Sequence, residues 1–143
     1  MNKLKGILLT QGMHGMISQV EGLAKALDID FTHHTVELNN FWKMIPPKFT
    51  PISQIVYKKV NQSDFDMIIS CGRKSVIPSI HLKNSLKKKV ISIHIQDPKV
   101  NFNNFDFIVA PEHDSINGQN VINTKGAIPV SYTHLTLPTI VDV

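Results

Sequence analysis

The residues with the most chemical capacity form one short run: Ser70, Cys71, Gly72, Arg73, Lys74 and Ser75. The run follows an apolar stretch and combines a glycine with two cations, which suits binding of a phosphate or a carboxylate. It is not a Walker A loop, because Met67 stands where the first glycine of that motif belongs. The competing interpretation is a helix that Ser75 caps, with two exposed cations at its start.

A second candidate loop spans residues 10–16, where Gly12 and Gly15 precede a helical pattern. Glycines before a helix leave backbone N–H groups open to an anion or to a sugar-phosphate oxygen. The spacing is not G-x-G-x-x-G, and no acidic residue closes the second predicted strand at Leu38, so the dinucleotide fingerprint is absent. His14 in this loop is either a general base or a solvated side chain.

Two further loops carry Gln96 and Asp97, and then His113 and Asp114. Because each follows an apolar strand, we expect these side chains to lie near one another, where a histidine beside carboxylates runs acid–base chemistry or is merely oriented by them. Asp97, His113 and Asp114 are therefore the expected catalytic groups. They are too few for a metal site, and we expect none.

The other histidines and the single cysteine add no ligand to this set. His33 and His34 fall on opposite faces of a predicted strand and cannot chelate one ion, while His94 lies within a strand and His81 within a helix. Cys71 reads as a small buried hydrophobe at a strand end more than as a nucleophile.

Apolar patterns predict the elements that position these loops. Strands are expected at 4–10, 31–38, 65–70, 89–95 and 105–110, with a sixth beginning at 120–122, and helices at 18–27, 52–60 and 75–86. Alternation of strands and helices predicts an α/β fold, a Rossmann-like, doubly wound and mainly parallel sheet. In such a sheet, ligands bind beyond the carboxyl ends of the strands, where the candidate loops lie.

Composition excludes several classes of protein. With 143 residues the chain fits one domain, and a single cysteine excludes a disulfide framework and a thiolate metal cluster, which suits the cytoplasm. No stretch is long and apolar enough for a signal peptide or a membrane span. The net charge of +4 comes largely from lysines at 83–89, where cations complement the C-terminal end of a predicted helix. No aromatic residues interleave with these lysines, so we expect no nucleic-acid partner.

Two segments depart from the repeating pattern. Residues 41–49 mix aromatic and aliphatic side chains with lysines, which suits either a loop packed on its own domain or contact with a membrane interface or a lipid-linked acceptor. Residues 129–143 lack a helical face and resemble a peptide read from adapter DNA, so we expect a native domain at 1–128 followed by a non-native tail.

Four motifs in register across residues 4–128 resemble the bacterial branch of the mitochondrial-fission ELM family. They are Gly12-x-x-Gly15-Met16-x-x-Gln19, Ser70-Cys71-Gly72-Arg73-Lys74-Ser75, Gln96-Asp97-Pro98 and Ala110-Pro111-x-His113-Asp114. The resemblance implies a glycosyltransferase of the GT-B architecture, of which this chain is the N-terminal, acceptor-side half and is inactive alone. The alternatives are a non-catalytic fission-type scaffold or binding module, and a nucleotide-sugar epimerase-like enzyme.

The resemblance also implies roles for individual residues. Gly12, Gly15 and Gln19 would shape the acceptor-side loop; Gly72, Arg73, Lys74 and Ser75 would line the cleft, and Gln96, Asp97, His113 and Asp114 would face it. It implies no bound cofactor and no metal. The nucleotide-sugar donor would be held by the missing C-terminal half, the acceptor is lipid-linked or otherwise unidentified, and the enzyme would work in the cytoplasm or at the inner face of the membrane.

Overall fold

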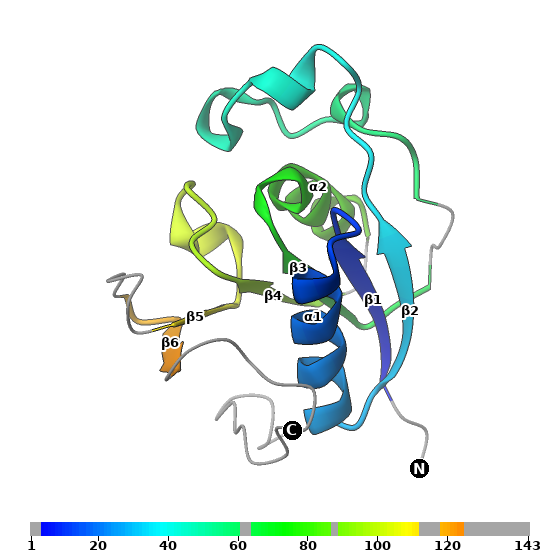
Figure 1. Ribbon diagram of the computed structural model, residues 1–143, viewed down its shortest axis with the longest axis vertical. Coiled ribbons are helices and arrows are strands. Elements are labelled where there is room, and N and C mark those ends of the chain that lie inside the picture. Colours follow the sequence, from blue (N-terminus) through cyan, green and yellow to red (C-terminus); the bar gives the residue numbers. More distant parts are fainter. Residues whose placement is uncertain (1–3, 61–63, 87–88, 112–117, 125–143) are drawn as a thin grey trace.

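The computed structural model describes residues 4–60, 64–86, 89–111 and 118–124. Within these ranges, six strands form one sheet in which every neighbouring pair is parallel (Figure 1). The strands in chain order are β1 (Lys5–Thr10), β2 (Asp30–Thr35), β3 (Met67–Cys71), β4 (Ile91–Ile95), β5 (Phe107–Pro111) and β6 (Val121–Thr124). Their order across the sheet is β2-β1-β3-β4-β5-β6. The predicted α/β fold with a parallel sheet is confirmed.

Helices α1 (His14–Ala26) and α2 (Val76–Ser85) cover opposite faces of this sheet. Successive residues of a strand point to opposite faces, so β1 contributes Leu8 to the core under α1 and Ile7 to the core under α2. Both side chains are fully buried. Strands buried on two faces read as continuous apolar runs, which is why the central strands were predictable from the sequence.

The chain changes direction in the sheet between β1 and β3. From β1 it passes through α1 to β2 at one edge, and then crosses back so that β3 lies on the other side of β1. This order is that of flavodoxin-like sheets, whose ligands bind at the point between these two central strands. The loops after β1 and β3 therefore lie where the fold favours a ligand.

Some predicted boundaries were wrong. Strand β2 ends at Thr35 instead of Leu38. The helix expected at 52–60 is only the 3-10 turn Gln54–Val56, because Tyr57 is extended and forms an antiparallel bridge with Leu38. Helix α2 starts one residue later than expected and holds Pro78 in its first turn, the position where proline is tolerated.

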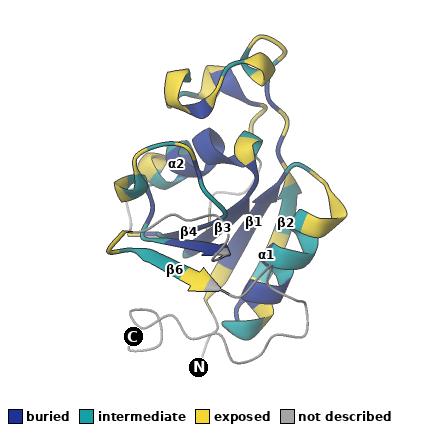
Figure 2. Ribbon diagram, turned by 60° about the vertical axis from the view of Figure 1, so that its left-hand side comes forward, coloured by how far each residue is buried: buried dark blue, intermediate teal, exposed yellow. Residues whose placement is uncertain are grey.

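Residues 38–60, hereafter the 38–60 segment, form an irregular excursion beyond the carboxyl ends of the strands, drawn in cyan to green at the top of Figure 1. Two further 3-10 turns, Trp42–Met44 and Pro47–Phe49, lie within it. Figure 2 shows exposed residues concentrated on this segment, whereas β1, β3 and β4 are largely buried. No helix in the described ranges has the length and apolar character needed to cross a membrane.

Candidate functional site

The loops after β1 and β3 meet at the direction change of the sheet. The side-chain oxygen Oε1 of Gln11 accepts a hydrogen bond of 3.1 Å from the backbone N–H of Lys74, which joins the two loops directly. We call Gln11, Gly12, Gly72, Arg73 and Lys74 the switch-point site. The sequence motifs at 10–16 and 70–75 therefore lie side by side.

Glycine is required at two positions of the switch-point site. Gly12 has φ +88° and Gly72 has φ +99°, conformations that residues with a Cβ rarely adopt. A Cβ on Gly72 would also lie 2.6 Å from Oε1 of Gln11 and 2.8 Å from the sulfur of Met16. The missing side chain lets the Gln11 side chain approach the backbone of the second loop.

The first loop is held by a short polar chain below it. The buried hydroxyl of Thr10 accepts a 3.1 Å hydrogen bond from the N–H of Gly12 and lies 2.7 Å from Nε2 of His33 on β2. Burial lowers the pKa of His33, although nearby Glu21 acts against this and His34 acts with it. His33 therefore helps to fix the Thr10 hydroxyl, which in turn holds the backbone of the first loop at Gly12.

Ser75 does not cap α2, so that prediction was wrong. Its backbone has the helical φ of −90° and ψ of −8°, and its Oγ donates 2.8 Å back to the carbonyl of Gly72. The backbone N–H of Ser75 reaches the same carbonyl at 3.1 Å. Ser75 is buried and tightens the turn Arg73–Ser75 in place of offering its hydroxyl to a ligand.

The N-terminus of α1 has no side-chain cap. Met13 at the N-cap position makes no such hydrogen bond, and the first turn holds no acidic residue. Gly15 and the exposed His14 lie in this turn, with open space where a Cβ of Gly15 would be. Gln19 lies half-buried one turn further on, and within the described ranges it makes no hydrogen bond to the switch-point site.

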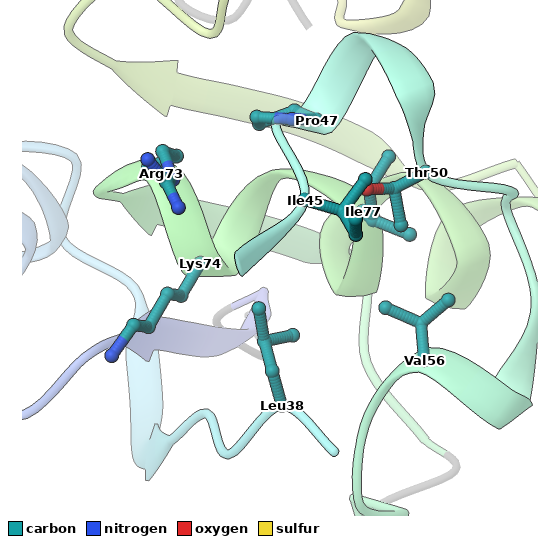
Figure 3. Close-up of a pocket in the computed structure, with 8 residues that line it drawn as sticks. All are labelled: Leu38, Ile45, Pro47, Thr50, Val56, Arg73, Lys74 and Ile77. Atoms are coloured by element: carbon teal, nitrogen blue, oxygen red, sulfur yellow. The ribbon is translucent and has the colours of Figure 1, made fainter. Parts of the chain in front are cut away.

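Arg73 links the switch-point site to the 38–60 segment. Its Nη2 donates a 3.0 Å hydrogen bond to the backbone carbonyl of Lys43. Figure 3 shows Arg73 and Lys74 at one side of a small pocket, with Leu38, Val56 and Ile77 at its apolar side. Its inner volume of about 10 Å³ admits little more than one water molecule. The 38–60 segment therefore covers α2 next to the site, and this pocket between them is too small for a ligand larger than water.

The residues after β4 lie at the same edge of the sheet but have local partners. Oδ1 of Asp97 accepts from the N–H of Lys99 at 2.9 Å, and Oδ2 lies 3.2 Å from the Lys99 ammonium. Gln96 is half-buried and has φ +86°. In the described ranges, no hydrogen bond or ion pair joins Gln96 or Asp97 to the switch-point site.

Buried titratable groups near the site are held neutral. His94 on β4 is fully enclosed with its Nδ1 2.8 Å from Oγ of Ser70, and burial lowers its pKa to about 3, with Asp97 opposing that shift. Burial raises the pKa of Cys71 to about 12, so its thiol is protonated at neutral pH. The interpretation of Cys71 as a buried hydrophobe is confirmed.

Several predicted residues lie outside the described residues. These include His113 and Asp114 and the whole of the expected tail at 129–143. The proximity of Asp97 to these two residues therefore stays a prediction, as does the domain boundary at 128. Across the part of the chain that the structure describes, no three His, Cys, Asp or Glu side chains gather as a metal site would require.

Sequence reasoning missed one member of the site, Gln11. Its role depends on a contact between loops 63 positions apart, and spacing along the chain carries no signal for such a pair. The available hint was its place directly after β1, at the carboxyl edge of a central strand.

Comparison with known proteins agrees with this architecture. The family model described as Mitochondrial fission ELM1 matches residues 14–135, most of the chain. No curated protein and no solved structure matches this chain. The family match includes Gly72, Arg73 and Lys74 of the switch-point site and the strands from β2 to β6, and it begins at residue 14, after β1, Gln11 and Gly12. The chain belongs to the mitochondrial fission ELM1 family.

Proposed function

We propose that this chain forms the acceptor-side part of a glycosyltransferase, and that the switch-point site lines its substrate cleft. The carrying observation is the contact of Gln11 with the Lys74 amide, which brings the two glycine loops together at the ligand-binding edge of the sheet. Membership of the ELM1 family and the doubly wound sheet support the same function.

The Gln11 contact also indicates what kind of atom the site accepts. Oε1 of Gln11 occupies the Lys74 N–H, and a phosphate oxygen of a substrate would use the same donor more strongly, since charge-assisted hydrogen bonds are shorter and tighter. The side chains of Arg73 and Lys74 add positive charge at this point. During sugar transfer, such donors stabilise the negative charge that develops on a phosphate leaving group.

The remaining parts of the proposed reaction come from elsewhere. A second half of the enzyme would hold the nucleoside and sugar of a nucleotide-sugar donor, while the donor's phosphates would reach the switch-point site on this chain. An acceptor hydroxyl would lose its proton to a base in the cleft. Asp97 is the carboxylate on the neighbouring β4 loop, and it would have to leave Lys99 to act. His113 and Asp114 complete the proposed set of bases.

The test is amide NMR of this chain titrated with UDP-glucose, UDP-N-acetylglucosamine and GDP-mannose, and with inorganic phosphate. We expect one of these probes to shift the backbone amide of Lys74 and the side-chain amide of Gln11 together, because the ligand oxygen replaces Oε1. Arg73→Ala should weaken binding roughly tenfold, as loss of one charge-assisted hydrogen bond does. Lys25→Ala, which removes an exposed cation at the far end of α1, is the matched control.

Two results would contradict the proposal. One is that no probe moves the Lys74 and Gln11 signals at any concentration. The other is that Arg73→Ala and Lys25→Ala weaken binding equally, which would mean that only net charge matters. In the complete enzyme, Arg73→Ala and Asp97→Asn should abolish sugar transfer, whereas a scaffold protein would keep its partners with both substitutions.

A further inference from the structure

The 38–60 segment carries most of the large apolar side chains that the protein exposes. Seven such residues are exposed in the described ranges, and five of them lie here: Phe41, Met44, Phe49, Ile52 and Ile55. Met44 is 84% exposed, and Phe41 and Phe49 are each 68% exposed. Single exposed apolar residues are ordinary, but a group of this kind on one excursion marks an interaction surface.

The segment is held in place with these side chains outward. Its two ends join in the bridge between Leu38 and Tyr57, and Asn39 donates from Nδ2 to the carbonyl of Ile55 at 2.6 Å. Val56 and Tyr57 are buried on the inner side, with the Tyr57 hydroxyl 2.7 Å from Nδ1 of His81 on α2. The segment thus has a packed inner side and a separate apolar outer side.

The charges on the segment are all of one sign. Lys43, Lys48, Lys58 and Lys59 lie between Glu37 and Asp64, and no acidic residue stands among them. Lys58 pairs with Glu37 at 3.2 Å, while Lys43 and Lys48 have no carboxylate partner in the described ranges. Exposed aromatics beside lysines suit the interface of an anionic bilayer, where rings enter the headgroup region and ammonium groups meet phosphates.

We propose that the 38–60 segment docks the protein on anionic membrane surfaces. Phe41, Met44 and Phe49 enter the headgroup region, and Lys43 and Lys48 contact lipid phosphates. The hydrogen bond from Arg73 to the Lys43 carbonyl holds the switch-point site next to this surface. A second copy of the chain is a poorer occupant, because a symmetric contact would set these lysines against one another.

Trp42 allows a direct test in the unaltered protein. It is the chain's single tryptophan, it lies in the segment, and its ring packs edge-on against Phe41 at 4.8 Å between centroids. With vesicles of phosphatidylcholine and phosphatidylglycerol, we expect its emission to shift to the blue and to be quenched by brominated lipid. Vesicles of phosphatidylcholine alone should bind much more weakly, because they lack the anionic charge.

Variants then separate apolar from charged contributions in vesicle co-sedimentation. Phe41→Ser with Phe49→Ser should reduce binding at least tenfold, whereas Leu4→Ser, at a residue 40% exposed outside the segment, should leave it unchanged. Lys43→Gln with Lys48→Gln should reduce binding to anionic vesicles by about fivefold per lysine at low salt, and Lys25→Gln is its control. Circular dichroism of each variant checks that it folds.

The proposal is overturned if anionic vesicles neither shift nor quench the Trp42 emission. It is also overturned if Leu4→Ser reduces vesicle binding as much as Phe41→Ser with Phe49→Ser does. Sedimentation showing a dimer that only the phenylalanine variant disrupts, without vesicle binding, would assign the surface to a protein contact instead. Nucleotide-sugar binding is read at Lys74 and Gln11, so it stands or falls separately from vesicle binding.

Discussion

Strand β3 and the 38–60 segment contain similar apolar residues and differ sharply in burial. Met67, Ile68 and Ile69 of β3 are fully buried, whereas Met44 and Ile55 of the segment are 84% and 63% exposed. Both faces of β3 are covered, one by α1 and the other by α2, while the segment has only its inner side packed. Burial here follows from position in the layers, and residue type alone does not decide it.

The sharpest way to test this contrast is to shorten a buried side chain of β3. Ile69→Ala should lower the free energy of unfolding by about 2–5 kcal/mol, because it leaves a cavity in the core under α1. Urea unfolding measures the change. A loss below about 1 kcal/mol would mean that the sheet centre is less tightly packed than its burial indicates.

The pH dependence of stability probes the same core through His94. The unfolded chain protonates this histidine near pH 6.5, but the folded chain keeps it neutral until about pH 3, so stability falls as the pH drops between these values. One such group contributes a slope of about 1.4 kcal/mol per pH unit.

Urea unfolding at several pH values should therefore give a shallower slope for His94→Gln than for the original chain. His33, whose pKa is also lowered, acts in the same direction, so His33→Gln serves as the comparison. Equal slopes for the His94 variant and the original chain would show that His94 gains a proton in the folded state as readily as in the unfolded state.

Gly72 lies at the boundary between the buried sheet and its exposed edge. Gly72→Ala should cost about 1–3 kcal/mol, because φ +99° with ψ 153° suits almost only glycine. It should also displace Gln11, which NMR would show as a shifted side-chain amide. Gly15→Ala is the control, with open space around the new methyl group and a helical backbone, and it should leave stability equal or slightly higher.

The smallest effect is expected on the exposed segment itself. Phe49→Ser removes more apolar surface than Ile69→Ala, yet it should change the free energy of unfolding by no more than about 0.5 kcal/mol. Thermal or urea unfolding of the two variants side by side gives the comparison. A cost similar to that of Ile69→Ala would place Phe49 in a packed environment and remove the contrast.

The sequence predicted the sheet better than its surroundings. Strands β1 and β3 hold the apolar runs Ile7-Leu8-Leu9 and Met67-Ile68-Ile69, which are typical of strands in a parallel sheet covered on both faces. The prediction of a helix at 52–60 was wrong because Ile52, Ile55 and Val56 have the i, i+3, i+4 spacing of a helical turn without forming a helix. Pairing of Tyr57 with Leu38, a contact formed only in the folded chain, decides the conformation there.

The site was predicted in part for a similar reason. Gly12, Gly72, Arg73 and Lys74 follow from the rule that ligands bind after the strands of a parallel sheet, and the structure brings them together. The inward turn of the Ser75 hydroxyl and the reach of Gln11 depend on local torsion angles and on a distant loop. Motif spacing does not encode either of these.

Because β1 lies between β2 and β3, it acquires its two neighbours at different times during synthesis. Ile7 pairs with Thr32 on β2, but its other partner is Ile68 on β3, which is synthesised later. Until β3 has been synthesised, one side of β1 lacks its final neighbour in the sheet, and unpaired strand edges promote association between chains. Sheets built from distant parallel strands also fold slowly. Packing of α1 on β1, both of which precede β3 in the chain, covers one face of β1 during this interval.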